Sequence, residues 1–134
     1  MPLSAELLRR VPYLEDQPRP VLEALAAIAS PLTFDAGEII FLQGEPSLGL
    51  YVVETGEVKI SRLSRDGREQ ILHIIRPGET FNDIAALDGG PNPAMATART
   101  AALIWLIRRG DLRQVATQYP GLAWAFIESA ARRA

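Results

Sequence analysis

Residues 44–60, which read GEPSLGLYVVETGEVKI, decide the fold. Two runs rich in valine, isoleucine, leucine and tyrosine, residues 50–54 and 57–63, meet in this stretch at the pair Thr55-Gly56. In the second run, apolar Val58 and Ile60 alternate with polar neighbours, which is the period of a strand with one buried face. Two such runs joined by a tight turn predict an antiparallel β-hairpin.

The same pattern extends outward from this hairpin, from residue 31 to residue 107. Turn signals that contain glycine or proline break the short apolar runs about every eight to twelve residues, which is the spacing of an antiparallel barrel or sandwich. The predicted strands are residues 32–34, 38–42, 50–54, 57–63, 69–75, 94–99 and 102–107. The sequence therefore predicts a mainly β protein.

Helices are expected on both sides of this β region. Ser4 can cap a short first helix, and a second helix follows from about Pro20, so residues 1–30 are predicted as a helical entry. Residues 108–134 are predicted as two further helices, the last of which opens at Pro120. This helix reaches Ala134 without a glycine, asparagine or proline to close it, and we expect it to be truncated.

Composition excludes several classes of protein and of site. With 134 residues, 48% hydrophobic and 22% charged, the chain is predicted to be one globular domain, residues 1–134. It has no cysteine and one histidine, His73, which excludes thiolate and multi-histidine metal sites and favours His73 as a structural residue of a strand. We expect no metal, and no arrangement of residues predicts an enzyme.

The chain shows no signal for a membrane or for nucleic acid. The longest apolar run, residues 101–107, is far shorter than the about 20 residues of a membrane-spanning helix, and the N-terminus lacks a signal-peptide profile. We therefore expect no membrane contact and a cytoplasmic location. A formal net charge of −2 gives no general electrostatic case for nucleic-acid binding by these residues.

Three segments together resemble one known family. Residues 44–60, followed by Asp66-Gly67-Arg68-Glu69 and by Arg76-Pro77-Gly78-Glu79-Thr80-Phe81, are similar to the sensor domain of the cyclic-AMP receptor protein (CRP/FNR) family of bacterial transcription regulators. The resemblance implies a double-stranded β-helix, that is, a jelly roll or cupin-like β-roll, with N-terminal helices and a C-terminal helix. In that family the roll encloses a cyclic-nucleotide pocket, and a separate C-terminal winged helix-turn-helix binds DNA.

The resemblance also implies a phosphate-binding cassette, which reads Phe-Gly-Glu-aliphatic and, several residues later, Arg-Ser-Ala in the family. Here Asn82 stands for the glycine, Asp83 for the glutamate that binds the ribose hydroxyl, and Asn92-Pro93 for Arg-Ser, with a one-residue ambiguity in the arginine position. The candidate ligand-binding residues are therefore Phe81, Asn82, Asp83, Ile84, Asn92, Pro93 and Ala94.

These replacements disfavour binding of cyclic AMP in the usual way. A charge-assisted contact to phosphate contributes about 1.5–3 kcal/mol, so its loss lowers affinity about 10- to 100-fold. Asn82 tolerates left-handed backbone angles, but its side chain occupies space that glycine leaves open. A cyclic nucleotide is thus a possible but disfavoured ligand, and the effector is an unknown small molecule.

Three alternatives stay open for this segment. Arg99 or another arginine can reach in from a neighbouring strand and replace the missing charge, or the pocket takes an uncharged or cationic ligand. The third alternative is that residues 81–87 are a plain turn and short helix that pack the roll.

The last helix carries apolar residues at helical spacing. Leu122, Phe126 and Ala130 are predicted as the seam with a second copy of the chain, so a homodimer through this helix is expected.

Taken together, the residues and the resemblance predict a non-enzymatic, effector-sensing domain of a CRP/FNR-type regulator. A ligand in the roll would bias the last helix, and a DNA-binding part outside these residues would respond. The alternative is a stand-alone cyclic-nucleotide-binding-like module that regulates a partner by protein–protein contact.

Overall fold

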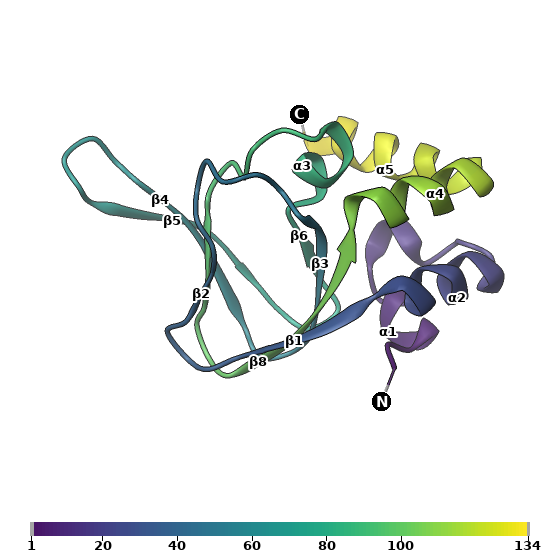
Figure 1. The fold of residues 1–134 in the computed structure, drawn as a ribbon, viewed down its shortest axis with the longest axis horizontal. Helices are drawn as coiled ribbons and strands as arrows, with labels where there is room; N and C mark the ends of the chain where they lie inside the picture. The colour runs from purple at the N-terminus through teal and green to yellow at the C-terminus, as the bar shows by residue number, and fades with distance from the viewer. Residues whose placement is uncertain (1, 134) are drawn as a thin grey trace.

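The computed structural model describes residues 2–133 and begins with short helices (Figure 1). These are α1 (Ala5–Arg9), the 3-10 helix η1 (Pro12–Leu14) and α2 (Arg19–Ile28). Ser4 caps α1 as predicted, because its hydroxyl accepts a hydrogen bond of 3.1 Å from the backbone N–H of Leu7. Pro20 occupies the first turn of α2, where its missing N–H costs nothing.

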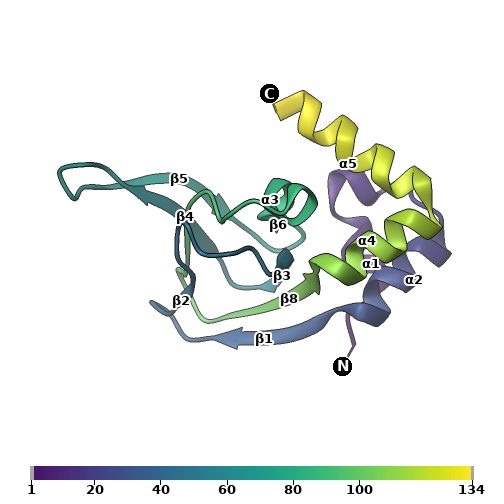
Figure 2. The same ribbon diagram turned by 45° about the horizontal axis from the view of Figure 1, so that its top comes forward.

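The described residues then form eight strands in two four-stranded antiparallel sheets. One sheet has the order β1-β8-β3-β6 and the other β2-β7-β4-β5, which confirms the predicted jelly roll with flanking helices. Figures 1 and 2 show the helices gathered at one end and the β4–β5 hairpin projecting from the other. The strands are β1 (Ser30–Phe34), β2 (Ile39–Phe41), β3 (Gly49–Thr55), β4 (Val58–Leu63), β5 (Glu69–Ile75), β6 (Thr80–Phe81), β7 (Met95–Ala98) and β8 (Ala102–Arg108).

Strand β3 separates two hydrophobic cores. Leu50 and Val52 face the core that the helices cover, whereas Tyr51 and Val53 face the interior of the roll. Successive side chains of a strand point to opposite faces, so a strand that is buried on both sides needs an unbroken apolar run. At the end of β3, Gly56 has φ +83°, and a Cβ there would lie 2.3 Å from the carbonyl oxygen of Ala101.

The C-terminal helices close the helical end. They are α4 (Arg109–Gln118) and α5 (Pro120–Arg133), and α5 packs on α4 and on η1. None of the helices in residues 2–133 is long and apolar enough to cross a membrane.

Two of the three residues of the predicted dimer seam are buried within the single chain. Leu122 is fully buried and Phe126 is 2% exposed within the single chain, with the Phe126 ring 4.9 Å from that of Tyr13. Helical spacing identified an apolar stripe but not its partner, which is the chain's own η1 and α4. The large apolar side chains exposed on the described part of α5 are Trp124 and Ile127, while Ala130 is half-buried.

Candidate functional site

A cavity of about 610 Å³ lies between the roll, η1 and α5. Its volume is within the range of about 300–1,000 Å³ that is typical of small-molecule sites. Six of the seven predicted site residues line it, namely Phe81, Asn82, Asp83, Ile84, Pro93 and Ala94. Asn92, the seventh, lies behind this wall and contacts Asn82.

Aromatic rings make the roll side of the cavity rigid. Phe81 stacks on Tyr51 with ring centres 4.9 Å apart and planes 11° apart, and Phe41 lies within 6.0 Å of both rings. Burial raises the pKa of the Tyr51 phenol above its ordinary value. Ile60 and Ile75 extend the apolar wall, so the body of a bound molecule would meet mainly carbon atoms.

Asn82 adopts the left-handed backbone that the sequence allowed for it. With φ 69° and ψ 23°, it directly precedes helix α3 (Asp83–Asp88), which begins at the next residue. Asparagine tolerates these angles better than most residues, so it replaces glycine here without breaking the turn.

The Asn82 side chain is held inside the cassette. Its Nδ2 donates to the Ser47 hydroxyl at 2.9 Å, to Asn92 Oδ1 at 3.0 Å and to the Gly49 carbonyl at 3.3 Å. Its Oδ1 is buried with no hydrogen-bond partner in the described part of the chain. The donors of this amide are therefore committed to protein oxygens, and the uncommitted atom is an acceptor that disfavours an anion.

Asn92, which with Pro93 is a candidate for the position of the family's arginine, also faces the protein. It is 3% exposed, and its Nδ2 donates to the Leu42 carbonyl at 3.2 Å. Backbone bonds from Gly44 N to Asn92 O and from Asn92 N to Glu45 O hold the segment in place. The cassette corner thus contains a neutral amide pair, Asn82 and Asn92.

Asp83 lines the cavity, and its carboxylate is bonded to two hydroxyl groups of the protein. The carboxylate is 6% exposed, and its Oδ2 accepts from Tyr13 at 2.6 Å and from Thr80 at 2.7 Å. The two hydroxyl oxygens lie 3.0 Å apart. This cluster ties α3 to the N-terminal η1. The sequence pattern gave no signal for Tyr13, which is distant in the chain from the cassette.

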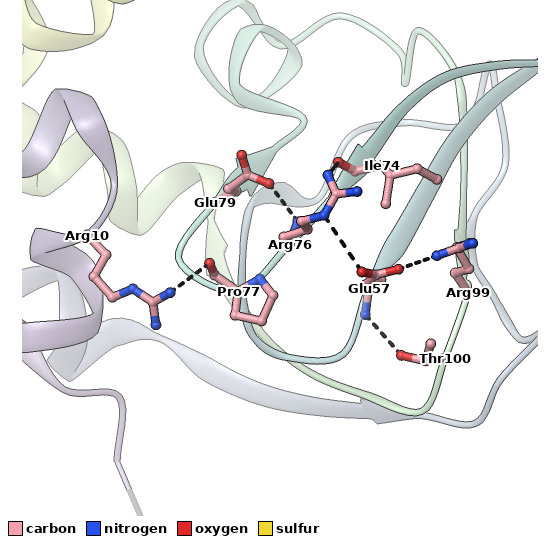
Figure 3. Close-up of polar contacts among 8 residues, drawn as sticks. All are labelled: Arg10, Glu57, Ile74, Arg76, Pro77, Glu79, Arg99 and Thr100. Atoms are coloured by element: carbon pink, nitrogen blue, oxygen red, sulfur yellow. Dashed lines mark hydrogen bonds and ion pairs between the residues drawn. The ribbon is translucent and has the colours of Figure 1, made fainter.

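Arg99 does not replace the missing cassette charge. Its guanidinium forms an ion pair with Glu57, and Glu57 forms a second ion pair with Arg76, with Nε and Oε2 3.7 Å apart (Figure 3). Glu57 N donates to the Thr100 hydroxyl at 3.0 Å, so the group belongs to the turns that follow β3 and β7. Arg99 does not line the cavity, so the alternative in which Arg99 replaces the missing charge is wrong.

Glu79 connects this ion network to the cavity wall. Its Oε1 accepts from the backbone N–H of Arg76 at 2.7 Å, and the adjacent Pro77 carbonyl accepts from Arg10 of the N-terminal part at 3.2 Å (Figure 3). Glu79 is therefore positioned by the turn rather than by a ligand.

The cavity has polar groups that sequence reasoning did not assign to it. His73 lines the cavity from β5, and its side chain is exposed rather than buried in the core. Ser129 and Arg132 line it from α5. The end of α5 lies next to α3 in the view of Figure 1 and above it, with a gap, in that of Figure 2. In residues 2–133 no three histidine, cysteine, aspartate or glutamate residues group as metal ligands do.

Comparison with known proteins agrees with this geometry. Residues 31–119 match the family described as "Cyclic nucleotide-binding domain". A "CRP-like cAMP-activated global transcriptional regulator" from Mycobacterium tuberculosis (strain CDC 1551 / Oshkosh) is 31% identical over 128 residues, which is 96% of this chain and 57% of that protein. The chain thus spans little more than half the length of this relative.

Two crystal structures share the fold. The N-terminal domain of a transcriptional regulator from Streptomyces coelicolor A3(2) is 35% identical with a TM-score of 0.83, over 95% of this chain and 89% of that one. The Thermus thermophilus Catabolite Activator Protein is 26% identical with a TM-score of 0.85, over 91% of this chain and 57% of that one. The chain belongs to the cyclic nucleotide-binding domain family, and its relatives include CRP-like transcription regulators.

Proposed function

We propose that this chain is the effector-sensing domain of a CRP/FNR-type transcription regulator and is not itself an enzyme. The observation that carries the proposal is the shared cavity of about 610 Å³: Phe81 and Ile84 line it from the roll side, and Ser129 and Arg132 line it from α5. A molecule that fills the cavity would contact both parts at once, and contact with both parts is what a sensor requires.

The mechanism is a shift between positions of α5. A ligand favours the position in which it has more contacts, and it shifts the equilibrium only by its difference in affinity for the two positions. Because α5 packs on α4 and η1, a change at its cavity end reaches the helical core. We propose that a DNA-binding part outside these residues responds to that change.

The cassette residues argue against binding of cyclic AMP in the family's usual way and favour another ligand. Asn92 supplies no positive charge, the Asn82 donors are used within the protein, and the Asp83 carboxylate is bonded to Tyr13 and Thr80. A cyclic phosphate placed there would meet the buried carboxylate and an amide acceptor without a compensating cation.

We also propose that two copies of the chain associate through α5, but through other residues than the sequence pattern predicted. If α5 pairs with a second copy, the contact uses the exposed Trp124 and Ile127, which are 61% and 53% exposed, rather than Leu122 and Phe126. Ala130 is half-buried beside them in sequence and stays a predicted member of that surface.

Hydrogen–deuterium exchange tests the sensor proposal. Protection of the α5 amides is measured with and without cavity filling, using Ala94→Leu as a permanent filler because Ala94 lines the cavity and is 3% exposed. We expect exchange to change in α5 and α3 and to stay constant in α2. Unchanged exchange in α5, in a variant that still folds, contradicts the proposal.

If the coding sequence of the whole protein contains no DNA-binding segment, the stand-alone module is the better account.

A further inference from the structure

We propose that the cavity takes a small apolar anion whose negative group is bound by Arg132 of α5, so that the cation comes from the helix and not from the cassette. The inference rests on the proposed sensor function and specifies its ligand. The class is a molecule with an aromatic or aliphatic body and one anionic group.

The charges along the cavity wall carry the first step. Of the arginines in residues 2–132, only Arg132 lines the cavity. Its guanidinium forms no ion pair or hydrogen bond with any described residue. Three other arginines have partners within the protein. Arg99 forms an ion pair with Glu57, Arg10 donates to the Pro77 carbonyl, and Arg109 donates to the Ala86 carbonyl at 3.1 Å. Arg132 is thus the strong cation that remains for a ligand.

The two carboxylates of the wall limit the ligand to a low negative charge. Asp83 accepts from the Tyr13 and Thr80 hydroxyls, and Glu79 accepts from the Arg76 backbone. Both carboxylates are acceptors, and each adds negative charge to the wall. One guanidinium binds one carboxylate or sulfonate well, often through two parallel hydrogen bonds.

The remaining wall favours an apolar body over a sugar. Phe41, Ile60, Ile75 and Phe81 present carbon atoms, and the Asp83 carboxylate, which would have to accept from a ribose hydroxyl, already has two donors. An apolar body on these residues and an anion on Arg132 would span the gap between the roll and α5.

Two related fluorescent probes test this assignment. Anilinonaphthalene sulfonate carries an aromatic body and one anion, and N-phenylnaphthylamine has the same kind of body without the charge. In the unmodified chain we expect the sulfonate to bind more tightly than the neutral probe. Arg132→Gln should weaken the sulfonate about tenfold, as loss of one charge-assisted contact does, and should change the neutral probe less than twofold.

Matched variants locate the binding. Arg113→Gln removes an exposed arginine of α4 that does not line the cavity, and it should change neither probe. Ala94→Leu, or Ile75→Trp if the first variant does not fold, should weaken both probes by filling the cavity. Trp124→Gln should change neither, because Trp124 is 61% exposed and does not line the cavity.

Two other outcomes of the probe experiments would each contradict one part of the proposal. If Arg132→Gln affects both probes equally or neither, while the filling variants abolish binding, Arg132 is not the anion partner and the sensor function stands. If binding survives both filling variants, the ligand class is wrong as well. Failure of the sensor function itself is a separate result, namely unchanged exchange in α5 on filling the cavity.

Discussion

The two polar ends of the cavity are built in opposite ways. At the cassette end, Asn82, Asn92 and Asp83 have partners within the chain, at 3.0 Å between the amides and at 2.6 Å and 2.7 Å to the carboxylate. At the α5 end, the side chains of Ser129 and Arg132 have no hydrogen-bond partner in the described part of the chain. Groups that are satisfied internally stabilise the fold, whereas groups left open are available to a ligand. The difference supports our proposal that the cassette corner is structural here and that recognition depends on α5.

The largest expected effect is on the Asp83 cluster. Asp83→Ala removes a buried acceptor and leaves the Tyr13 and Thr80 hydroxyls without it, so the free energy of unfolding should fall by about 2–4 kcal/mol. Urea denaturation measures the change. Asp16→Ala, at an exposed position with no side-chain hydrogen bond, is the control and should cost under about 0.5 kcal/mol. Equal small losses in both variants would show that Asp83 is not structural.

A charge introduced at Asn92 should also be destabilising. Asn92→Arg places a guanidinium at a 3% exposed position beside the Asn82 amide, and we expect a loss of about 2 kcal/mol in the free energy of unfolding.

Combining Asn92→Arg with Asn82→Gly and Asp83→Glu restores the family's pattern and should bring back binding of cyclic AMP. If the triple variant folds and shows no gain, the alignment of Asn92 with the family's arginine is wrong.

The backbone at Asn82 predicts an intermediate effect. Asn82→Ala keeps φ at 69° with a residue that disfavours it and also loses the amide bonds, so thermal or urea unfolding should show a loss of about 2 kcal/mol. Asn82→Gly loses the same bonds without the strain and should cost about 1 kcal/mol less than the alanine variant. An alanine variant as stable as the glycine variant would contradict the left-handed assignment.

The smallest expected effect is at the α5 end. Arg132→Gln and Ser129→Ala should each change the free energy of unfolding by under about 0.5 kcal/mol, because neither side chain has a hydrogen bond to lose in residues 2–133. The same denaturation series measures both. A loss as large as that of Asp83→Ala would remove the contrast between the two ends.

The sequence was a good guide to the roll and a partial guide to the site. The unbroken apolar run of β3 and the Thr55-Gly56 turn placed the central strands within a residue or so, because alternation and turn chemistry are local. The two-residue strand β6 was missed, since Thr80 and Phe81 are too short a run to show a period. Of the seven cassette residues, six line the cavity and Asn92 does not, and their role in binding a ligand stays a prediction.

What the sequence did not show depends on contacts distant in the chain. Tyr13 reaches Asp83 across 70 positions, and Arg132 lines the cavity from α5, which is distant in the chain from the cassette. The stripe of Leu122 and Phe126 was visible, but whether it met a second copy or the chain's own Tyr13 is a question of packing that spacing does not decide.

Calorimetric titration of the chain with cyclic AMP tests the central claim most directly. If the cassette corner is structural, titration up to about 1 mM should show no saturable binding, since the charge-assisted phosphate contact is missing. Saturable binding with a Kd of about 1 μM, lost in Ala94→Leu and retained in Arg132→Gln, would show that the cassette still binds the nucleotide and would contradict the account.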